Sequence, residues 1–318
     1  MSLQLRIFLL SLFLAVAAGA GDIWSKWKNH NDIVGFPQPQ ASDYEQNKTR
    51  LFKPRLHVWG GCLPYPAVDS QGYLGSGLKP TGKKSGDCWD TSQSGQIYAR
   101  TGSSHGRDAI IYAWYEPKVR WAKGNSNGHR HYWRSVVVWL TQNGCDFDNV
   151  AELAMAGISY SIDVEAYDTS ISGKTIWTGG DGMSPTVTDG IHTHPLVSSW
   201  GNKNLGPSDV GLEGTFSQPL IDWASLSQPA RDALNGVIYE HTKVPFSDAN
   251  IQGALDAAYN AAFYHGLVLD DCGDDREPVN QGDGKNEPLS AMNDKEDTAS
   301  CPTNSGYLYN TINDIEYT

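Results

Sequence analysis

The chain has 318 residues and a formal net charge of −12, with 36 Asp and Glu against 24 Lys and Arg. This composition disfavours a nucleic-acid-binding role, because phosphate binding needs a basic face that the chain does not provide. The counts of 15 Tyr and 11 Trp are high, and such amphipathic rings favour recognition surfaces, although core packing explains many of them equally well.

Residues 1–20 have the pattern of a secretory signal peptide. A single charge at Arg6 precedes the apolar run Ile7–Val16, and small residues follow at Ala18–Ala20. The apolar run is shorter than the ~20 residues that span a bilayer, and no later stretch approaches that length. We therefore expect a secreted, extracellular protein whose membrane contacts are peripheral.

Three further regions follow the signal peptide. Residues 21–54 are polar and contain Pro, and we expect an N-terminal extension with a glycosylation site at Asn47 in a surface loop, from the pattern Asn-Lys-Thr. Residues 55–266 hold the predicted strands and helices. Residues 267–318 form an acidic tail that we expect to be loosely ordered, and its spacing does not fit a calcium-binding EF-hand.

Five cysteines in a secreted chain predict disulfides and one cysteine left over. Cys62 and Cys88 bracket a Gly- and Pro-rich segment, and a bridge between them would close a loop of about 27 residues and contribute roughly 3 kcal/mol. Cys272 with Cys301 is the second predicted pair, which leaves Cys145 free. A bridge from Cys145 to Cys272 is the alternative.

Strands and helices are predicted from hydrophobic periodicity. Residues 158–167 alternate between apolar and polar, which predicts one half-buried antiparallel strand. Residues 131–140 carry apolar side chains on both faces and predict a strand covered on both sides. A helix should begin near Ser227 with Pro229 in its first turn. A second helix should be capped by Ser247, carry an apolar stripe through Phe263 and stop at Gly266.

The most chemically dense stretch is the seven-residue segment Gly128–Arg134, which we call the heptad. It reads Gly-His-Arg-His-Tyr-Trp-Arg and lies between the β-rich runs AIIYAWY and SVVVWL. Guanidinium and imidazole groups donate directed hydrogen bonds to anions, and aromatic faces cover apolar ligand surface. The heptad therefore predicts either an anion- or sugar-binding site or a buried hydrogen-bond network. The candidate ligand-binding residues are His129, Arg130, His131, Tyr132, Trp133 and Arg134.

A metal site is the competing interpretation of His129-x-His131. Two histidines on one strand face still need further ligands, and the residues that follow supply no carboxylate. Arg130 and Arg134 would also place positive charge beside the cation. His192 and His194 form a second such pair, which could meet the first or could belong to a turn or the surface. A metal-dependent hydrolase is disfavoured because no carboxylate base accompanies these histidines.

The heptad resembles the hallmark Gly-His-Arg-His-Asp-Trp-Glu of the necrosis- and ethylene-inducing (NLP-type) proteins of plant-associated microbes. The likeness covers roughly residues 55–265 and includes AIIYAWYEPK, GGCLPYPAVD, GLKPTG and the segments of both predicted helices. It implies an α+β, mostly β fold. The expected architecture is a central antiparallel β-sandwich, similar to that of the actinoporin cytolysins, flanked by helices and followed here by the acidic C-terminal extension.

The resemblance also implies a function without catalysis. Members of the family bind glycosylated sphingolipid heads on plant plasma membranes, damage the membrane, and hold a divalent cation, Ca²⁺ or Mg²⁺. Of the family's cation ligands only His129 is retained, because the three carboxylate positions fall at Val119, Tyr132 and Arg134. We therefore expect the cation site to be lost or weakened, with Arg134 offering positive charge to an anionic headgroup instead. Trp200 matches the family's exposed loop tryptophan at the membrane interface.

The leading hypothesis is a secreted, monomeric NLP-like effector with weak or lost cytolytic activity, bound to a plant glycosphingolipid. The alternatives are a non-lytic carbohydrate- or lipid-headgroup-binding protein, and a decoy recognised by a host surface receptor through AIIYAWY and the heptad. A metal-dependent hydrolase ranks below both.

Overall fold

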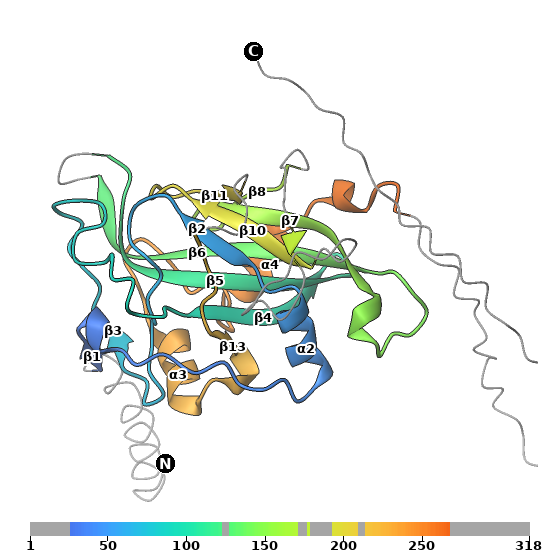
Figure 1. The fold of residues 1–318 in the computed structure, drawn as a ribbon, viewed down its shortest axis with the longest axis horizontal. Helices are drawn as coiled ribbons and strands as arrows, with labels where there is room; N and C mark the ends of the chain where they lie inside the picture. Colours follow the sequence, from blue (N-terminus) through green and yellow to red (C-terminus); the bar gives the residue numbers. More distant parts are fainter. Residues whose placement is uncertain (1–25, 123–126, 171–176, 179–192, 209–213, 268–318) are drawn as a thin grey trace, which may run out of the picture. The chain divides into compact units, whose positions relative to one another are not determined.

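A long antiparallel hairpin lies at the centre of the fold (Figure 1), formed by β5 (Arg107–Arg120) and β6 (Gly128–Gln142). β-branched and aromatic residues dominate both strands and favour an extended, buried backbone. The register pairs Trp114 with Arg134 and Val119 with His129. The heptad is therefore the first half of β6, directly after the turn of the hairpin.

The computed structural model describes residues 26–122, 127–170, 177–178, 193–208 and 214–267. All of these belong to one compact unit of the chain, Met1–Asp271. The predicted signal peptide, His192, Cys272, Cys301 and the acidic tail lie outside the described residues. No helix in the described ranges is both long and apolar enough to cross a bilayer.

Two sheets pack face to face as a β-sandwich. The six-stranded sheet has the order β13-β4-β5-β6-β7-β8, and the other has the order β11-β10-β2-β12 with β9 paired to β10. Besides β5 and β6, the two sheets contain the following strands: β2 (Arg55–Val58), β4 (Ile97–Ser104), β7 (Leu153–Asp163), β8 (Ala166–Asp168), β9 (Trp177–Thr178), β10 (His194–Ser199), β11 (Leu205–Pro207), β12 (Thr215–Phe216) and β13 (Leu220–Asp222). The predicted sandwich is confirmed, although β2 with β10 and β4 with β13 are parallel pairs.

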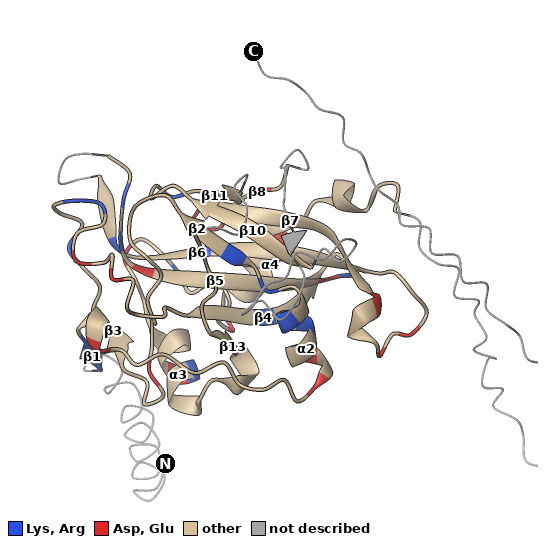
Figure 2. Cartoon of the chain, in the orientation of Figure 1, with Lys and Arg blue, Asp and Glu red and all other residues tan. Residues whose placement is uncertain are grey.

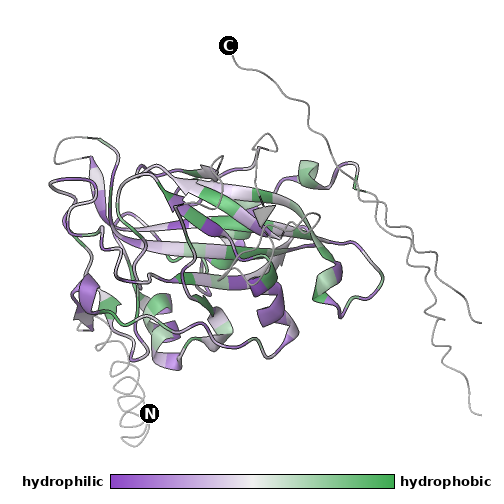
Figure 3. Ribbon diagram, in the orientation of Figure 1, coloured by the Kyte–Doolittle hydropathy of each residue, from purple (hydrophilic) through white to green (hydrophobic). Residues whose placement is uncertain are grey.

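Each face of the six-stranded sheet has its own core, and Figure 3 shows hydrophobic residues on the strands and α3. Between the two sheets, Val136 and Val138 pack with Val58 and Val197. On the opposite face, residues such as Trp139 pack against the helices. Strand β6 is therefore covered on both sides, as its sequence predicts.

In the described residues, three α-helices and four short 3-10 helices accompany the sheets. The described helices are α2 (Tyr44–Leu51), α3 (Gln228–Gly236), α4 (Ile251–Ala258), η2 (His30–Asp32), η3 (Val150–Glu152), η4 (Trp223–Ser225) and η5 (Ala261–Tyr264). A short parallel pair, β1 (Trp27–Lys28) with β3 (Leu74–Gly75), lies beside η2. Helix α3 begins after Ser227 as predicted. The second predicted helix is shorter than expected, since α4 starts after Asn250 and its stripe continues into the separate turn η5.

The prediction of one half-buried strand over residues 158–167 is wrong in two respects. The chain turns at Glu165, whose φ is 58°, so β7 and β8 form a hairpin. Ser159 and Ser161 were expected to face solvent but are buried. Their hydroxyl groups are satisfied inside the protein, because Ser159 Oγ donates to the Ala258 carbonyl and Ser161 Oγ accepts from the Ser135 N–H.

The Cys62–Cys88 disulfide is confirmed, and the expectation of a free Cys145 is wrong. Cys62 and Cys88 are joined across 26 residues. Cys145, in the exposed loop after β6, is also disulfide-bonded. Disulfides form and persist in oxidising environments.

The predicted glycosylation site lies in helix α2, not in a surface loop. Asn47 is exposed, and its Nδ2 donates to the Asp43 carbonyl at 2.9 Å. Thr49, the third residue of the site, is buried, and its hydroxyl donates to Asp222 Oδ1 at 2.5 Å. Glycosylation at Asn47 stays a prediction.

Replacing both Cys62 and Cys88 by Ser should lower the free energy of unfolding by about 3 kcal/mol, since the bridge constrains the unfolded chain. Urea unfolding followed by tryptophan fluorescence measures the change. Reduction of the unmodified protein, which also breaks the bridge of Cys145, gives the upper limit of the loss. A loss below about 1 kcal/mol would show that the unfolded segment is already restricted without the bridge.

Candidate functional site

The heptad divides into an accessible start and a buried remainder. His129 is partly exposed and Arg130 is exposed, with Arg130 Nη1 donating to the Ser76 carbonyl at 3.0 Å. The other four side chains are at most 9% exposed: His131, Tyr132, Trp133 and Arg134. Only the first part of the predicted binding segment therefore faces solvent, and the buried part supports it.

His131 is held in a strained backbone conformation by its surroundings. Its φ is 58°, in the left-handed region, and it lies opposite Pro117, which has no N–H to donate. Tyr115 Oη lies 2.6 Å from His131 Nδ1. Gly77 passes so close that a Cβ there would lie 2.6 Å from His131 Cε1. Burial, assisted by Arg130, lowers the pKa of His131 to about 4, so the ring is neutral at neutral pH.

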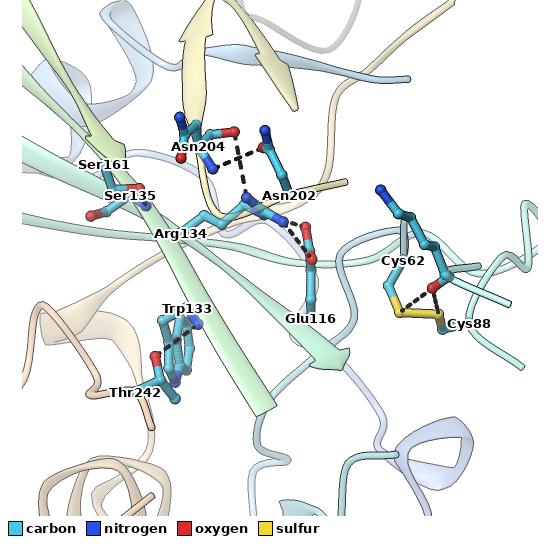
Figure 4. Close-up of polar contacts among 11 residues, drawn as sticks. Cys62, Cys88, Glu116, Trp133, Arg134, Ser135, Ser161, Asn202, Asn204 and Thr242 are labelled. Carbon is cyan, nitrogen blue, oxygen red and sulfur yellow. Dashed lines mark hydrogen bonds and ion pairs between the residues drawn. A yellow bond between two sulfur atoms is a disulfide. The ribbon is translucent and has the colours of Figure 1, made fainter. Parts of the chain in front are cut away.

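Arg134 is fully buried and paired with Glu116 of β5 (Figure 4). Its Nε donates to Glu116 Oε1 at 2.5 Å and its Nη2 donates to Oε2 at 3.1 Å. Arg134 Nη1 donates to the Asn204 carbonyl at 3.5 Å. Burial raises the pKa of Glu116, and the guanidinium opposes that shift. The guanidinium thus joins β5, β6 and the loop Trp200–Asn204, and it does not face solvent.

His129 belongs to a cluster of rings at the end of the hairpin. Its ring stacks on His241 with centroids 3.9 Å apart, and Trp121 meets it edge-on at 4.7 Å. Burial lowers the pKa of His129, and the neighbouring His241 and Lys203 lower it further. The neutral imidazole can therefore donate or accept a hydrogen bond at the protein surface.

Two carboxylates lie beside this cluster: Asp163 at the end of β7, and Glu240, whose Oε1 lies 3.2 Å from His241 Nε2. Lys203 Nζ donates to Asp163 Oδ2 at 2.6 Å, and Tyr132 Oη donates to Oδ1 at 3.4 Å. Partial burial raises the pKa of Asp163, but the hydrogen bonds from Lys203 and the Val164 N–H outweigh it, so the pKa lies below its usual value. Lys203 also lies 5.0 Å from the centre of the Trp121 ring.

A pocket opens on the helix side of the same strands. Trp133, Asp163, Glu165 and Lys243 contribute an aromatic ring and three charged groups to its wall. The Trp133 N–H donates to Thr242 Oγ1 at 3.1 Å, which fixes the loop before α4 along the pocket. Figure 2 shows Lys and Arg together with Asp and Glu on the loops at the left.

The remaining candidates from the sequence are Trp200, His194 and the run 109–115. Trp200 is exposed at the end of β10. His194 is buried in β10, where its Nδ1 donates to the Lys53 carbonyl at 2.8 Å, so it is neither a turn nor a surface residue. Residues 109–115, the AIIYAWY run, are at most 1% exposed, so a host receptor cannot reach this segment in the folded protein.

Comparison with known proteins places the chain in a family. A family model described as "Necrosis inducing protein (NPP1)" matches residues 46–258. This chain belongs to the necrosis-inducing protein family. The "Necrosis-inducing protein NPP1" of Phytophthora nicotianae is 33% identical over 255 residues, which cover 80% of this chain and 98% of the relative.

Solved structures of NLP proteins share the fold. "NLPPya in complex with mannosamine" is 35% identical with a TM-score of 0.58, covering 74% of this chain and 99% of that one. The structure described as "non-toxic HaNLP3 protein" is 28% identical with a TM-score of 0.58, covering 72% and 98%. The fold is therefore shared with a protein that is described as non-toxic.

The divalent cation implied by the family resemblance does not fit the residues at this site. Val119 is buried opposite His129, and Arg134 puts a guanidinium where a carboxylate ligand is expected. Hard cations need several oxygen ligands, whereas the neighbours of His129 are rings and Lys203, with Asp163 already bonded to Lys203 and Glu240 to His241. Among the residues that the structure describes, no group of three or more His, Cys, Asp or Glu is arranged to hold a metal ion.

Replacing Glu116 by Gln should lower the free energy of unfolding by about 3–5 kcal/mol, because it leaves the Arg134 charge buried without a counter-charge. Arg134→Met should cost less, since a buried carboxyl group can take up a proton and a guanidinium cannot lose one. The double variant Glu116→Leu/Arg134→Met should recover most of the loss. Equal losses in both single variants would contradict this asymmetry; urea unfolding at pH 7 measures them.

Stability should fall on acidification because of His131. A folded-state pKa of about 4, below the ordinary 6.5, means that the unfolded chain binds the proton more readily, so stability is full above pH 6.5 and is lost as pH falls towards 4. The loss should approach about 3 kcal/mol. His131→Asn, which tolerates the left-handed conformation, should flatten this part of the profile. An unchanged slope in the variant would assign the effect to other groups.

Proposed function

We propose that this chain is a secreted NLP-type effector that binds glycosylated sphingolipid headgroups at the plant plasma membrane. Its contact is peripheral and includes Trp200, it acts as a monomer, and no catalytic step is assigned to it. Family membership and the mannosamine complex of a relative support a carbohydrate ligand. The observation that carries the proposal is the accessible pair His129 and Arg130 at the hairpin end, beside the ring cluster.

The proposed contact uses neutral and cationic donors on the protein itself. Arg130 and the partly exposed Lys203 supply positive charge to an anionic headgroup, and His129 supplies a directed hydrogen bond. The buried Arg134–Glu116 pair holds the neighbouring loop in place. Binding therefore depends on no divalent cation in this proposal, and cytolytic activity is weak or lost with the family's cation ligands.

A non-lytic headgroup-binding protein is the second candidate. Arg134 replaces a cation ligand of the family with a buried group that is satisfied inside the protein. A relative of the same fold is described as non-toxic, so the fold by itself does not imply membrane damage. Binding without leakage would favour this candidate over a weak lysin.

Sedimentation with vesicles tests the proposal. The protein should bind phosphatidylcholine vesicles that contain a glycosylated plant sphingolipid and should not bind phosphatidylcholine alone. Excess EDTA should leave binding unchanged. Arg130→Ala should weaken binding about tenfold through loss of a charge-assisted contact, while Arg231→Ala, which removes a partly exposed arginine on α3, should have no effect. Equal binding to both vesicle types would refute headgroup recognition.

A further inference from the structure

Two exposed tryptophans follow two neighbouring parallel strands. Strands β2 and β10 are paired in register up to Val58 and Ser199, and the Trp59 N–H donates to the Ser199 carbonyl at 2.8 Å. Trp59 and Trp200 are the next residues on each strand. Their exposed fractions are 53% and 45%, so about half of each residue is covered by the protein and half is open.

The Trp59 ring is held against the sheet by polar neighbours. Its Nε1 donates to Ser198 Oγ at 3.4 Å, and its ring lies 4.3 Å from the His57 ring at an angle of 38°. These contacts cover one side of the indole and restrict its rotation. A ring that is already ordered loses little conformational entropy when a ligand binds.

Trp200 lies directly on the backbone of the next strand. A Cβ at Gly206 in β11 would lie 2.9 Å from Trp200 Cη2, so no side chain larger than hydrogen fits beneath the ring. A glycine in a strand often marks such a close approach. The absence of a side chain at Gly206 therefore gives Trp200 its place on the sheet.

Both rings lie on the same face of this sheet. Side chains of alternate residues point to one face, so Ser198 and Trp200 share a face, and Trp59 reaches Ser198 on it. The other face carries Val58 and Val197 into the core between the sheets. The two indoles thus form an aromatic platform on the outer side of the β-sandwich.

We propose that Trp59 and Trp200 form a stacking platform for a pyranose ring of the headgroup glycan. This inference rests on the proposed function and specifies which part of the ligand these rings contact. The C–H groups on one face of a sugar match the negative faces of the indoles. The sugar hydroxyls can stay hydrated or bond to the polar residues that hold the rings.

The surroundings of the two rings favour a sugar over the hydrocarbon of a bilayer. The groups that hold them are the imidazole of His57, the hydroxyl of Ser198 and the bare backbone of Gly206. In addition, Lys203 of the loop Trp200–Asn204 bonds to Asp163 beside the His129 cluster, so one extended headgroup can contact both the platform and the accessible start of the heptad.

Nuclear magnetic resonance of the indole N–H groups tests the platform without a membrane. The full protein, labelled with ¹⁵N-tryptophan, is titrated with free mannosamine, and the signals are assigned with Trp59→Phe and Trp200→Phe. We expect both signals to shift while that of Trp89, which is 42% exposed, stays in place. Gly206→Val, which displaces Trp200, should weaken mannosamine binding about five- to tenfold, and Trp89→Phe should not.

The outcomes separate the platform from the proposed function. Unmoved Trp59 and Trp200 signals overturn the platform, whatever the vesicles show. Shifts of both signals together with no preference for glycolipid vesicles support the platform and reject the headgroup function. If Trp59→Ala and Trp200→Ala reduce binding to vesicles without glycolipid but leave mannosamine binding intact, the rings contact the bilayer and the platform is rejected. Near-native unfolding of each variant confirms that it is folded.

Discussion

The functional end of this protein depends on one buried ion pair. Arg134 and Glu116 are each at most 1% exposed, and two hydrogen bonds join them across β5 and β6. Removing two charges from water is costly, and only good geometry and further hydrogen bonds offset that cost. Here the third contact, to the Asn204 carbonyl, extends the pair to the loop after β10. The pair therefore specifies how two sheets and a loop meet, whether or not it adds net stability.

The fold could be predicted where a single pattern determined it. Apolar residues on both faces of β6 required a cover on each side, and the structure supplies the second sheet and the helices. The prediction of a half-buried strand over residues 158–167 was wrong because Ser and Asp at alternate positions have the pattern of a solvent-facing stripe. In the structure, Ser159 and Ser161 bond to groups that arrive from other parts of the chain. The alternation of apolar and polar residues cannot distinguish a hydroxyl that bonds to water from one that bonds to a backbone group from a distant part of the chain.

The candidate site includes partners that the heptad sequence does not reveal. The heptad contains His129 and Arg130, yet His241, Lys203 and Asp163 reach it from separate loops and strands. Glu116 was the partner that the sequence could have revealed. It lies in AIIYAWYEPK, and Arg134 stands where the family heptad has Glu. An acid and a base in neighbouring strands complement each other, because each would be costly to bury alone.

The buried ion pair also holds the loop Trp200–Asn204 in place. A bound cation orders a site only at concentrations near its dissociation constant, whereas a guanidinium is part of the chain and stays charged at any physiological pH. Arg134 holds the Asn204 carbonyl, and Lys203 is fixed by Asp163. The same loop begins at Trp200, whose ring lies against Gly206. Contacts within the protein therefore position the loop that carries the exposed indole, so the proposed recognition requires no bound divalent cation.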